Sequence, residues 1–230
     1  EGLRVVGNPY ELSQKYYEDG ADQIIVTDIV ASLYSRDNLF NTIDKLTNNI
    51  FIPITAGGGI RSLDDIRFLL KVGADRISIN SHLFENPEIL NEISNTFGGQ
   101  FLTVMIEVKK IGNDYFCMKN HGRDNSGFKI DKWLDFLSDK NIGELAVYSV
   151  DNDGTNKGYD ENLINIINKK KIKYPLIYGG GLSNINNISS LIKKTNSTGI
   201  SLSSSLHFNL LKIKTLKSEL KKLDININEI

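Results

Sequence analysis

The sequence predicts an α/β protein folded as a (β/α)8 barrel (a TIM barrel), and two observations support this prediction. Apolar, β-branched runs alternate with amphipathic helical patterns along the whole chain, which is typical of parallel strands covered by helices. A long internal repeat divides the chain into halves of about 1–100 and 101–230. We therefore expect a single barrel domain over residues 1–230, built from two half-barrel repeats.

Seven strands can be placed on the sequence, with helices between them. The strand-like runs cover residues 23–27, 51–55, 76–79, 101–106, 144–148, 174–178 and 199–202. The clearest helical patterns cover residues 62–72, 87–96, 131–140 and 162–170. The near-continuous hydrophobicity of the strand runs is typical of parallel strands buried on both faces. Ser62, followed by Asp65, predicts a variant of the capping box at the start of the first of these helices.

The repeat distinguishes the barrel from a doubly wound sheet. Residues 57–84 and 179–208 share a triple glycine, an aliphatic residue, a helix, a strand ending in small polar residues and a closing aromatic residue. The two triple glycines begin 122 residues apart. A second pair of matching strand ends precedes them, with Asp28 before the first glycines and Asp151 before the second.

The same repeat predicts an eighth strand that the seven runs do not include. The run at 101–106 opens the second half, and its counterpart in the first half would lie before Glu1. Because an incomplete barrel would leave two open sheet edges, we expect about twenty further N-terminal residues to carry the first strand. The absence of an initiator Met agrees with a trimmed sequence.

Composition and charge exclude several classes of protein. The 27 Lys and Arg residues nearly balance the 28 Asp and Glu residues, so no excess of cations favours nucleic-acid binding. No apolar run approaches the roughly 20 residues that cross a bilayer. One cysteine excludes an internal disulfide and multi-cysteine metal sites, which together predicts a protein of the reducing cytoplasm. The three histidines are too scattered to predict a metal site.

The two glycine runs predict two phosphate sites at one end of the barrel. Glycines before a helix allow main-chain N–H groups to approach an anion, and the helix N-terminus adds favourable partial charge. Each following strand ends in small polar residues that can complete the site. The residues concerned are Gly57, Gly58, Gly59, Asn80 and Ser81 in the first half, and Gly179, Gly180, Gly181, Ser204 and Ser205 in the second. Two such sites imply a long substrate with a phosphate at each end, whereas the simpler interpretation is a pair of tight turns.

Carboxylates at the same strand ends are candidate general acids and bases. Asp28, Glu107, Asp151 and Asp153 all follow predicted strands, where the active face of a barrel lies. The alternative for Glu107 is an ion pair with Lys109 or Lys110, and for Asp153 simple turn chemistry before Gly154. Residues 114–127 predict a small inserted hairpin, and long insertions at this face are often functional lids. Cys117 within it is interpreted as a packed or exposed bystander and not as a nucleophile.

Several motifs resemble the HisF family, the cyclase subunit of imidazole glycerol phosphate synthase. The resemblance extends from about residue 2 to about residue 223, and its most diagnostic part is Asp151-Asn152-Asp153-Gly154-Thr155 followed by Gly158-Tyr159-Asp160. It implies a (β/α)8 barrel that takes ammonia from a separate HisH-like glutaminase in a heterodimer. The implied substrate is a bisphosphorylated ribulosyl aminoimidazole carboxamide, converted to imidazole glycerol phosphate and aminoimidazole carboxamide ribotide without a metal or organic cofactor.

The resemblance also implies roles for individual residues. Glu107 stands where the family has a catalytic aspartate, and Asp28 and Asp153 match acidic positions near the substrate. Tyr148 and Tyr178 stand where smaller residues are usual, at strand ends expected to face the pocket. The phosphate sites are matched by Gly57, Gly58, Asn80, Gly179, Gly180 and Ser205; an ammonia gate by Gln23, Arg76 and Glu144; and a glutaminase-docking position by Asp75.

Three functions stay open from the sequence. The intact motif at 151–160 and both glycine runs favour a histidine-pathway cyclase. The changes at Glu107, Tyr148, Tyr178 and Gln23 favour a paralogue that supplies ammonia for amidotransfer to a nucleotide sugar in surface-glycan synthesis. The exchange of the catalytic aspartate for Glu107 also allows a non-catalytic subunit that only conducts ammonia or activates the glutaminase.

Overall fold

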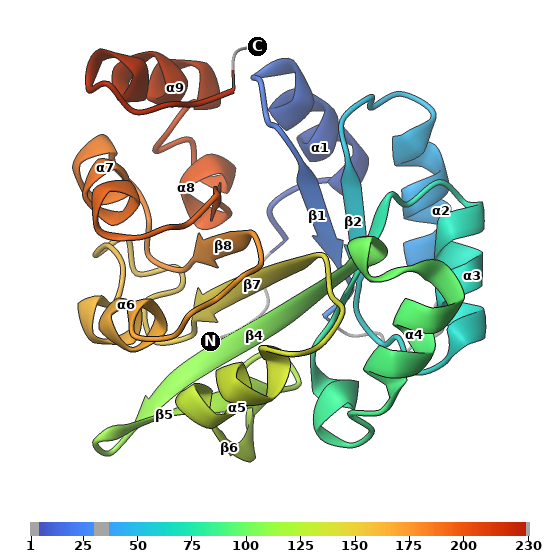
Figure 1. The fold of residues 1–230 in the computed structure, drawn as a ribbon. Coiled ribbons are helices and arrows are strands. Elements are labelled where there is room, and N and C mark those ends of the chain that lie inside the picture. The colour runs from blue at the N-terminus through green and yellow to red at the C-terminus, as the bar shows by residue number, and fades with distance from the viewer. Residues whose placement is uncertain (1–4, 30–36, 229–230) are drawn as a thin grey trace.

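The computed structural model describes residues 5–29 and 37–228, and its centre is a curled parallel sheet (Figure 1). The strand order is β1-β2-β3-β4-β7-β8-β9, and every neighbouring pair in it is parallel. The bounds are β1 Ile24–Thr27, β2 Ile54–Gly57, β3 Arg76–Ile79, β4 Leu102–Ile111, β7 Glu144–Ser149, β8 Leu176–Gly179 and β9 Gly199–Ser201. All seven predicted strands are thus present, although the second and the sixth begin later than predicted, at Ile54 and Leu176. Within the described ranges, β1 and β9 each pair with one strand only.

Helices follow the strands and cover the outside of the sheet (Figure 1). They are α1 Pro9–Glu18, α2 Asp37–Thr47, α3 Leu63–Lys71, α4 Ile89–Phe97, α5 Ile130–Leu137, α6 Glu161–Asn168, α7 Ile185–Lys194, α8 Ser204–His207 and α9 Ile213–Lys222, with short 3-10 turns at Ser81–Phe84 and Gly99–Phe101. This alternation around a curled parallel sheet is the (β/α)8 architecture that the sequence predicts. No helix in the described part of the chain is long and apolar enough to span a bilayer.

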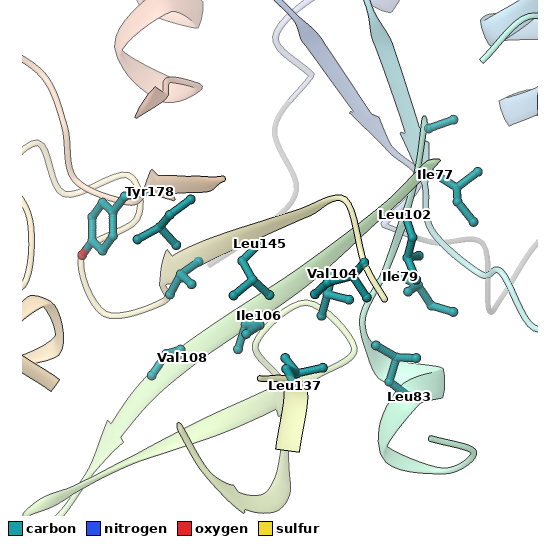
Figure 2. Packing of buried hydrophobic residues seen from close by; sticks show 14 of the residues in the cluster. Ile77, Ile79, Leu83, Leu102, Val104, Ile106, Val108, Leu137, Leu145 and Tyr178 are labelled. Carbon is teal, nitrogen blue, oxygen red and sulfur yellow. The ribbon is translucent and has the colours of Figure 1, made fainter. Parts of the chain in front are cut away.

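Strand side chains alternate between the helices outside and the interior of the curl. Leu102, Val104 and Ile106 of β4 are completely buried and pack in one cluster with Leu137 of α5 (Figure 2). Thr103, Met105 and Glu107 alternate with them and therefore point to the interior. This alternation decides which residues can form a site.

The antiparallel hairpin predicted after the fourth observed strand is also present. β5, Asp114–Lys119, pairs with the long C-terminal part of β4, and β6, Asp124–Lys129, pairs with β5. Cys117 lies on β5 with no exposed surface, and this burial raises the pKa of its thiol. The thiol therefore stays protonated, which agrees with its interpretation as a packed residue.

The two halves repeat the same local contacts. The predicted capping box forms at α3, where Asp65 N–H donates to Ser62 Oγ over 3.2 Å, and Asn184 with Asn187 forms its counterpart at α7. The first amide of β2, from Ile54, donates to Asp75 Oδ2 over 2.8 Å, and that of β8, from Leu176, donates to Thr198 Oγ1 over 3.0 Å. The repeat in the sequence is therefore a repeat of contacts as well as of residues.

One pairing inferred from the repeat is wrong. The strand registers match Thr27 with Gly57 in the first half and Tyr148 with Gly179 in the second, so the counterpart of Asp28 is Ser149 and not Asp151. Asp151 lies two residues further on, and its carboxylate accepts a hydrogen bond of 2.7 Å from Lys110 N–H. The sequence comparison was displaced because the loops after the two strands differ in length.

Both halves bring two main chains together at the second glycine of each run. A Cβ atom added to Gly58 would lie 2.2 Å from the carbonyl oxygen of Asp28, and one added to Gly180 would lie 2.6 Å from that of Ser149. Both glycines also have positive φ, +100° and +104°. Only glycine satisfies both the conformation and the contact.

Replacing Gly58 tests this close approach. We expect Gly58→Ala to lower the free energy of unfolding by about 3 kcal/mol or more, because the added methyl group meets main-chain atoms that cannot rotate away. Gly112→Ala is the matched control: its φ is +64°, but nothing lies within 4 Å of the added carbon. There we expect only the left-handed strain of about 1–2 kcal/mol. Equal losses in urea denaturation would contradict the argument.

Candidate active site at the carboxyl ends of the strands

A cleft lies at the carboxyl ends of β1 to β4, where the sequence predicts the active face. Its walls come from the strand ends, the first glycine run and the tip of the hairpin. The lining residues that matter for chemistry are Thr27, Asp28, Gly58, Gly59, Asn80, Ser81, Glu107, His121 and Arg123. The structure thus gathers the candidate acids Asp28 and Glu107 beside one predicted phosphate site.

Glu107 occupies the inner face of β4 at the centre of this cleft. Asn80 Nδ2 donates to Glu107 Oε2 over 2.9 Å, and His121 Nδ1 lies 3.7 Å from Oε1. No ion pair joins Glu107 to Lys109 or Lys110, all three of which lie in the described chain, so the predicted alternative is wrong. Burial raises the pKa of Glu107 to about 7, outweighing the hydrogen bonds from Gly122 and Asn80 that lower it. A carboxyl with this pKa can both give and take a proton near neutral pH.

Asp153 acts on this carboxyl from the loop after β7. Its negative charge adds to the rise in the pKa of Glu107, while Arg123 opposes it. Partial burial also raises the pKa of Asp153 itself, although the residue stays largely exposed. Asp28 and Glu107 therefore line one cleft, and Asp153 acts on Glu107 through its charge, whereas Asp151 is engaged with the main chain of Lys110.

The turn between β5 and β6, which we call the hairpin tip, forms one wall of the cleft. The sequence analysis did not predict that His121 and Arg123 of this turn lie there. Asn80 Nδ2 also donates to the carbonyl oxygen of Met118, and Asn120 N–H donates to Ser81 Oγ over 2.9 Å. These bonds hold the tip against the residues predicted to bind the first phosphate. The signal in the sequence was the insertion directly after Glu107. When a strand continues into a hairpin, the returning strand brings the next turn back beside the residue where the insertion began, here Glu107.

Asn120 and His121 both have positive φ, 51° and 58°. Such consecutive left-handed residues are uncommon outside glycine and make the tight turn that directs His121 toward Glu107. Burial and the nearby charge of Arg123 lower the pKa of His121, so it is mostly neutral at neutral pH. This wall therefore places the neutral imidazole of His121 beside the Glu107 carboxyl, which is partly protonated near neutral pH.

The first glycine run divides its tasks between packing and the cleft. Gly58 and Gly59 have positive φ, +100° and +66°, and line the cleft with Asn80 and Ser81. Gly57 lies one residue deeper, where an added Cβ would meet Ser78 Oγ at 1.9 Å. Asn80 Oδ1 is buried without a hydrogen-bond partner. Gly57 thus makes room for a neighbouring strand, and its two successors shape the cleft.

The second glycine run stands at the end of β8 on the same edge of the sheet but is buried. Gly179, Gly180 and Gly181 have little exposed surface, and Gly158 N–H donates to the carbonyl oxygen of Gly181 over 2.9 Å. Ser203 has the same backbone angles as Asn80, φ −134° and ψ −86°, so Ser204 is the counterpart of Ser81. Ser205 is completely buried, and its Oγ has no partner.

Tyr148 and Tyr178 point in opposite directions, so the expectation that both face the pocket is wrong for Tyr178. Tyr178 belongs to the outer layer of packed residues (Figure 2), and its hydroxyl accepts a hydrogen bond of 3.2 Å from Asp160 N–H. Tyr148 pairs with Glu107 in the strand register and points to the interior, where its hydroxyl donates to Ser201 Oγ over 3.0 Å. Alternation along a strand requires this difference, since Tyr178 pairs with Val147.

Comparison with known proteins identifies the family. Residues 1–212 match the family model described as "Histidine biosynthesis protein". Two relatives are named imidazole glycerol phosphate synthase subunit HisF: one from Natranaerobius thermophilus is 36% identical, covering 98% of this chain and 89% of the relative, and one from Legionella pneumophila is 40% identical, covering 80% and 87%. A third with that name, from Sulfolobus acidocaldarius, is 35% identical over 96% of this chain and 88% of the relative.

The chain belongs to the HisF family. The resemblance seen in the sequence is therefore confirmed, and so is the barrel fold that it implied. The roles that it implied for individual residues stay predictions, and the structure shows only where those residues lie.

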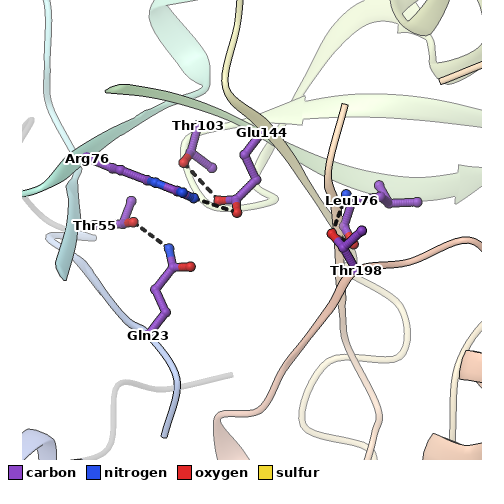
Figure 3. Close-up of polar contacts among 7 residues, drawn as sticks. All are labelled: Gln23, Thr55, Arg76, Thr103, Glu144, Leu176 and Thr198. Atoms are coloured by element: carbon purple, nitrogen blue, oxygen red, sulfur yellow. Dashed lines mark hydrogen bonds and ion pairs between the residues drawn. The ribbon is translucent and has the colours of Figure 1, made fainter. Parts of the chain in front are cut away.

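The positions predicted to form an ammonia gate lie at the opposite end of the strands from Glu107. Arg76 Nη1 lies 2.8 Å from Glu144 Oε2, and Thr103 Oγ1 donates to the other carboxylate oxygen over 3.0 Å (Figure 3). The Glu144 side chain is only 6% exposed, so both partners are needed to compensate its burial. Gln23 forms no hydrogen bond with either of these described residues and instead donates to Thr55 Oγ1 over 2.6 Å. The structure adds Thr55 and Thr103 to this layer, which sequence reasoning missed.

Asp75, the predicted docking position, is exposed but has a structural partner. Its carboxylate accepts the hydrogen bond from Ile54 N–H described above. In the second half, Thr198 accepts the equivalent bond from Leu176 N–H (Figure 3). One oxygen of Asp75 therefore holds the start of β2. Its role in docking stays a prediction.

The raised pKa of Glu107 predicts a pH-dependent difference in stability. Because the folded protein binds this proton more tightly than the unfolded chain, ionisation costs stability as pH rises from about 4.5 to about 7. We expect Glu107→Gln to gain about 3 kcal/mol over the wild type at pH 8 and almost nothing at pH 4. Urea denaturation across this range measures the difference, and a gain that does not change with pH would refute the assignment.

The contact between Tyr148 and Gly179 predicts that their substitutions are coupled. A Cβ atom on Gly179 would lie 2.5 Å from the Tyr148 ring, whereas the backbone there is ordinary strand. We expect Gly179→Ala to destabilise the wild type by about 2 kcal/mol and to be tolerated with Tyr148→Thr. Gly57→Ala, which meets Ser78, is the control and should cost the same in both backgrounds. Additive losses for Gly179→Ala and Tyr148→Thr would contradict the contact.

Proposed function

We propose that this chain is the cyclase subunit of an imidazole glycerol phosphate synthase. It takes ammonia from a HisH-like glutaminase and converts a bisphosphorylated ribulosyl aminoimidazole carboxamide to imidazole glycerol phosphate and aminoimidazole carboxamide ribotide. Family membership and the names of the three relatives support this reaction. For this chain, the observation that carries the proposal is Glu107. This residue has a pKa of about 7 and lies beside the first glycine run.

Glu107 is the proposed proton-transfer group. Addition of ammonia to a carbonyl and loss of the oxygen as water require a proton to be delivered and another removed, and a carboxyl with a pKa near 7 serves both steps. Asp28 and Asp153 are proposed to stabilise the positively charged nitrogen that forms when ammonia adds. Gly58, Gly59, Asn80 and Ser81 hold one phosphate, with the N-terminus of α3 behind them.

The amino ends of the strands are the proposed entry for ammonia. The layer of Gln23, Arg76 and Glu144 closes the interior there, so an ammonia molecule passes only when the contact between Arg76 and Glu144 opens. Phe51 lies just before β2 at the same end and is 79% exposed, which suits a surface that a glutaminase covers. Asp75 is exposed nearby and is the proposed polar contact.

Tyr148 and Glu107 also support a second candidate. A longer acid and a bulky interior side chain favour a HisF paralogue that delivers ammonia to another enzyme for amidotransfer to a nucleotide sugar. A subunit without chemistry of its own, which only conducts ammonia or activates the glutaminase, is the limiting case. All these candidates use the proposed gate at the amino ends of the strands. They differ in whether Glu107 transfers protons in a cyclase reaction.

A turnover assay separates the candidates. The full-length protein is supplied with ammonium and the ribulosyl substrate, and loss of the substrate chromophore is followed. We expect turnover above about 0.1 s⁻¹, a fall of about 10²-fold or more in Glu107→Gln, and retained turnover in Glu107→Asp. Glu161→Gln, which removes an exposed partner of Lys194, is the control and should leave turnover unchanged.

One outcome would contradict the cyclase, and another would contradict only the role of Glu107. Absence of turnover in both wild type and Glu107→Asp, with the glutaminase still stimulated, would leave ammonia delivery as the function. Full turnover in Glu107→Gln would remove Glu107 from the chemistry.

A further inference from the structure

The cleft contains a second group that can carry a proton near neutral pH, the imidazole of His121. Its Nδ1 lies 3.7 Å from Glu107 Oε1, while Asn80 Nδ2 donates to the other carboxyl oxygen over 2.9 Å. A separation of 3.7 Å is too long for a direct hydrogen bond, so neither of these two atoms is engaged by the other. Both side chains line the cleft and are neighbours there.

The hairpin tip holds His121 in this position through a strained turn. Three successive residues, Asn120, His121 and Gly122, have φ of 51°, 58° and 75°. Glycine adopts this left-handed conformation readily and asparagine tolerates it, but it is strained for histidine. Asn120 N–H donates to Ser81 Oγ over 2.9 Å, and a Cβ added to Gly122 would lie 2.9 Å from the Val150 side chain. Contacts on both sides thus fix the turn, and strain that is fixed in this way is characteristic of functional sites.

Charged groups from several elements face the two side chains. Burial and the positive charge of Arg123 lower the pKa of His121, while the negative charge of Asp28 opposes them. Burial raises the pKa of Glu107 to about 7, with Asp153 adding to the rise and Arg123 opposing it. The usual order of the two groups is therefore inverted, and between their pKa values the carboxyl holds a proton while the imidazole is neutral. The cleft has three further charged or titratable residues, Arg61, His82 and Glu85.

We propose that His121 is a second catalytic residue of this site, which accepts a proton from the substrate while Glu107 donates one. This inference deepens the proposed function, on which it rests for the reaction. A single carboxyl must give one proton and take another in turn. Two neighbouring groups, one protonated and one neutral, perform both transfers in the same step.

The addition of ammonia to a carbonyl shows how the protons balance. Ammonia forms a C–N bond to the carbonyl carbon, which leaves a positive charge on nitrogen and a negative charge on oxygen. Glu107 gives its proton to the oxygen and His121 removes one from the nitrogen, so a carbinolamine results. The carboxylate and imidazolium then face each other at 3.7 Å, and the proton returns to Glu107 through a small movement or one bridging water. A second cycle protonates the hydroxyl, which leaves as water, and removes a proton from the nitrogen as the C=N bond forms.

Titration of the imidazoles by NMR tests the pair without any turnover. The chain has three histidines, so His121→Asn removes one signal and thereby assigns it. In the wild type we expect the His121 signal to show its own titration below pH 6.5 and a second inflection near pH 7, where Glu107 ionises. Glu107→Gln should abolish the second inflection and leave the first in place, because the carboxyl is already neutral while the imidazole titrates.

Two results of this titration would overturn the proposal. A fall of about one unit or more in the His121 midpoint of Glu107→Gln would reveal an ion pair, in which His121 is already protonated and cannot accept a proton. Absence of the second inflection in the wild type would show that the two groups do not sense each other.

His121→Asn also tests the chemistry, because asparagine suits the φ of 58° and does not titrate in this range. At a fixed concentration of free ammonia, we expect kcat to fall about 10²-fold, with little change in KM for the ribulosyl substrate. Wild-type kcat/KM should fall on the acidic side as His121 is protonated and on the alkaline side as Glu107 ionises. His121→Asn should lose the acidic fall and Glu107→Gln the alkaline one. Wild-type turnover in His121→Asn, or an acidic fall that persists there, would overturn the proposal.

Asp224→Asn is the matched control. Asp224 has the same backbone conformation, with φ of 55°, and follows α9 outside the cleft, so turnover and the His121 titration should not change. If His121→Asn fails to fold, His121→Gly replaces it with the same expectation, because glycine adopts positive φ without strain. Absence of turnover in the wild type would contradict the proposed function, and the NMR titration would then decide this inference by itself.

Discussion

The candidate site depends on the close approach of two main chains at the second glycine of each run. Gly58 lies against the main chain of Asp28, and Gly180 against that of Ser149, with no space for a side chain. In each half, this contact joins the end of one strand to the glycine turn that follows the neighbouring strand, so the two strands end at the same level. Asp28 and Glu107 both line the cleft, and their positions depend on where these strands end.

The alternation of side chains along parallel strands then selects the groups that meet inside the barrel. Glu107 and Tyr148 are register partners and share the interior, while their neighbours Ile106 and Val147 pack under the helices. The continuation of β4 into the hairpin returns His121 and Arg123 to the end of their own strand. The burial that results moves the pKa of Glu107 to a range useful for proton transfer.

The two halves show how a duplicated frame acquires different tasks. Contacts that hold the frame recur, such as the capping boxes and the bonds from Asp75 and Thr198 to the starts of β2 and β8. Residues that face the interior diverge, as Thr27 and Tyr148 do. A frame that is maintained by main-chain contacts leaves the interior side chains free to change, which is why an asymmetric substrate can be served by a nearly symmetric fold.

The sequence by itself determined the strand order, the half-barrel repeat and the location of the acids and glycines at strand ends, because hydrophobic period and glycine position are local properties. Only the tertiary structure decided that Asp28 matches Ser149, that Tyr178 faces away from the interior, and that the second glycine run is buried. It also decided that His121 joins Glu107 and that Gln23 bonds to Thr55. These features depend on the strand register and on contacts between loops that are distant in the sequence, and neither can be read from the sequence of one protein.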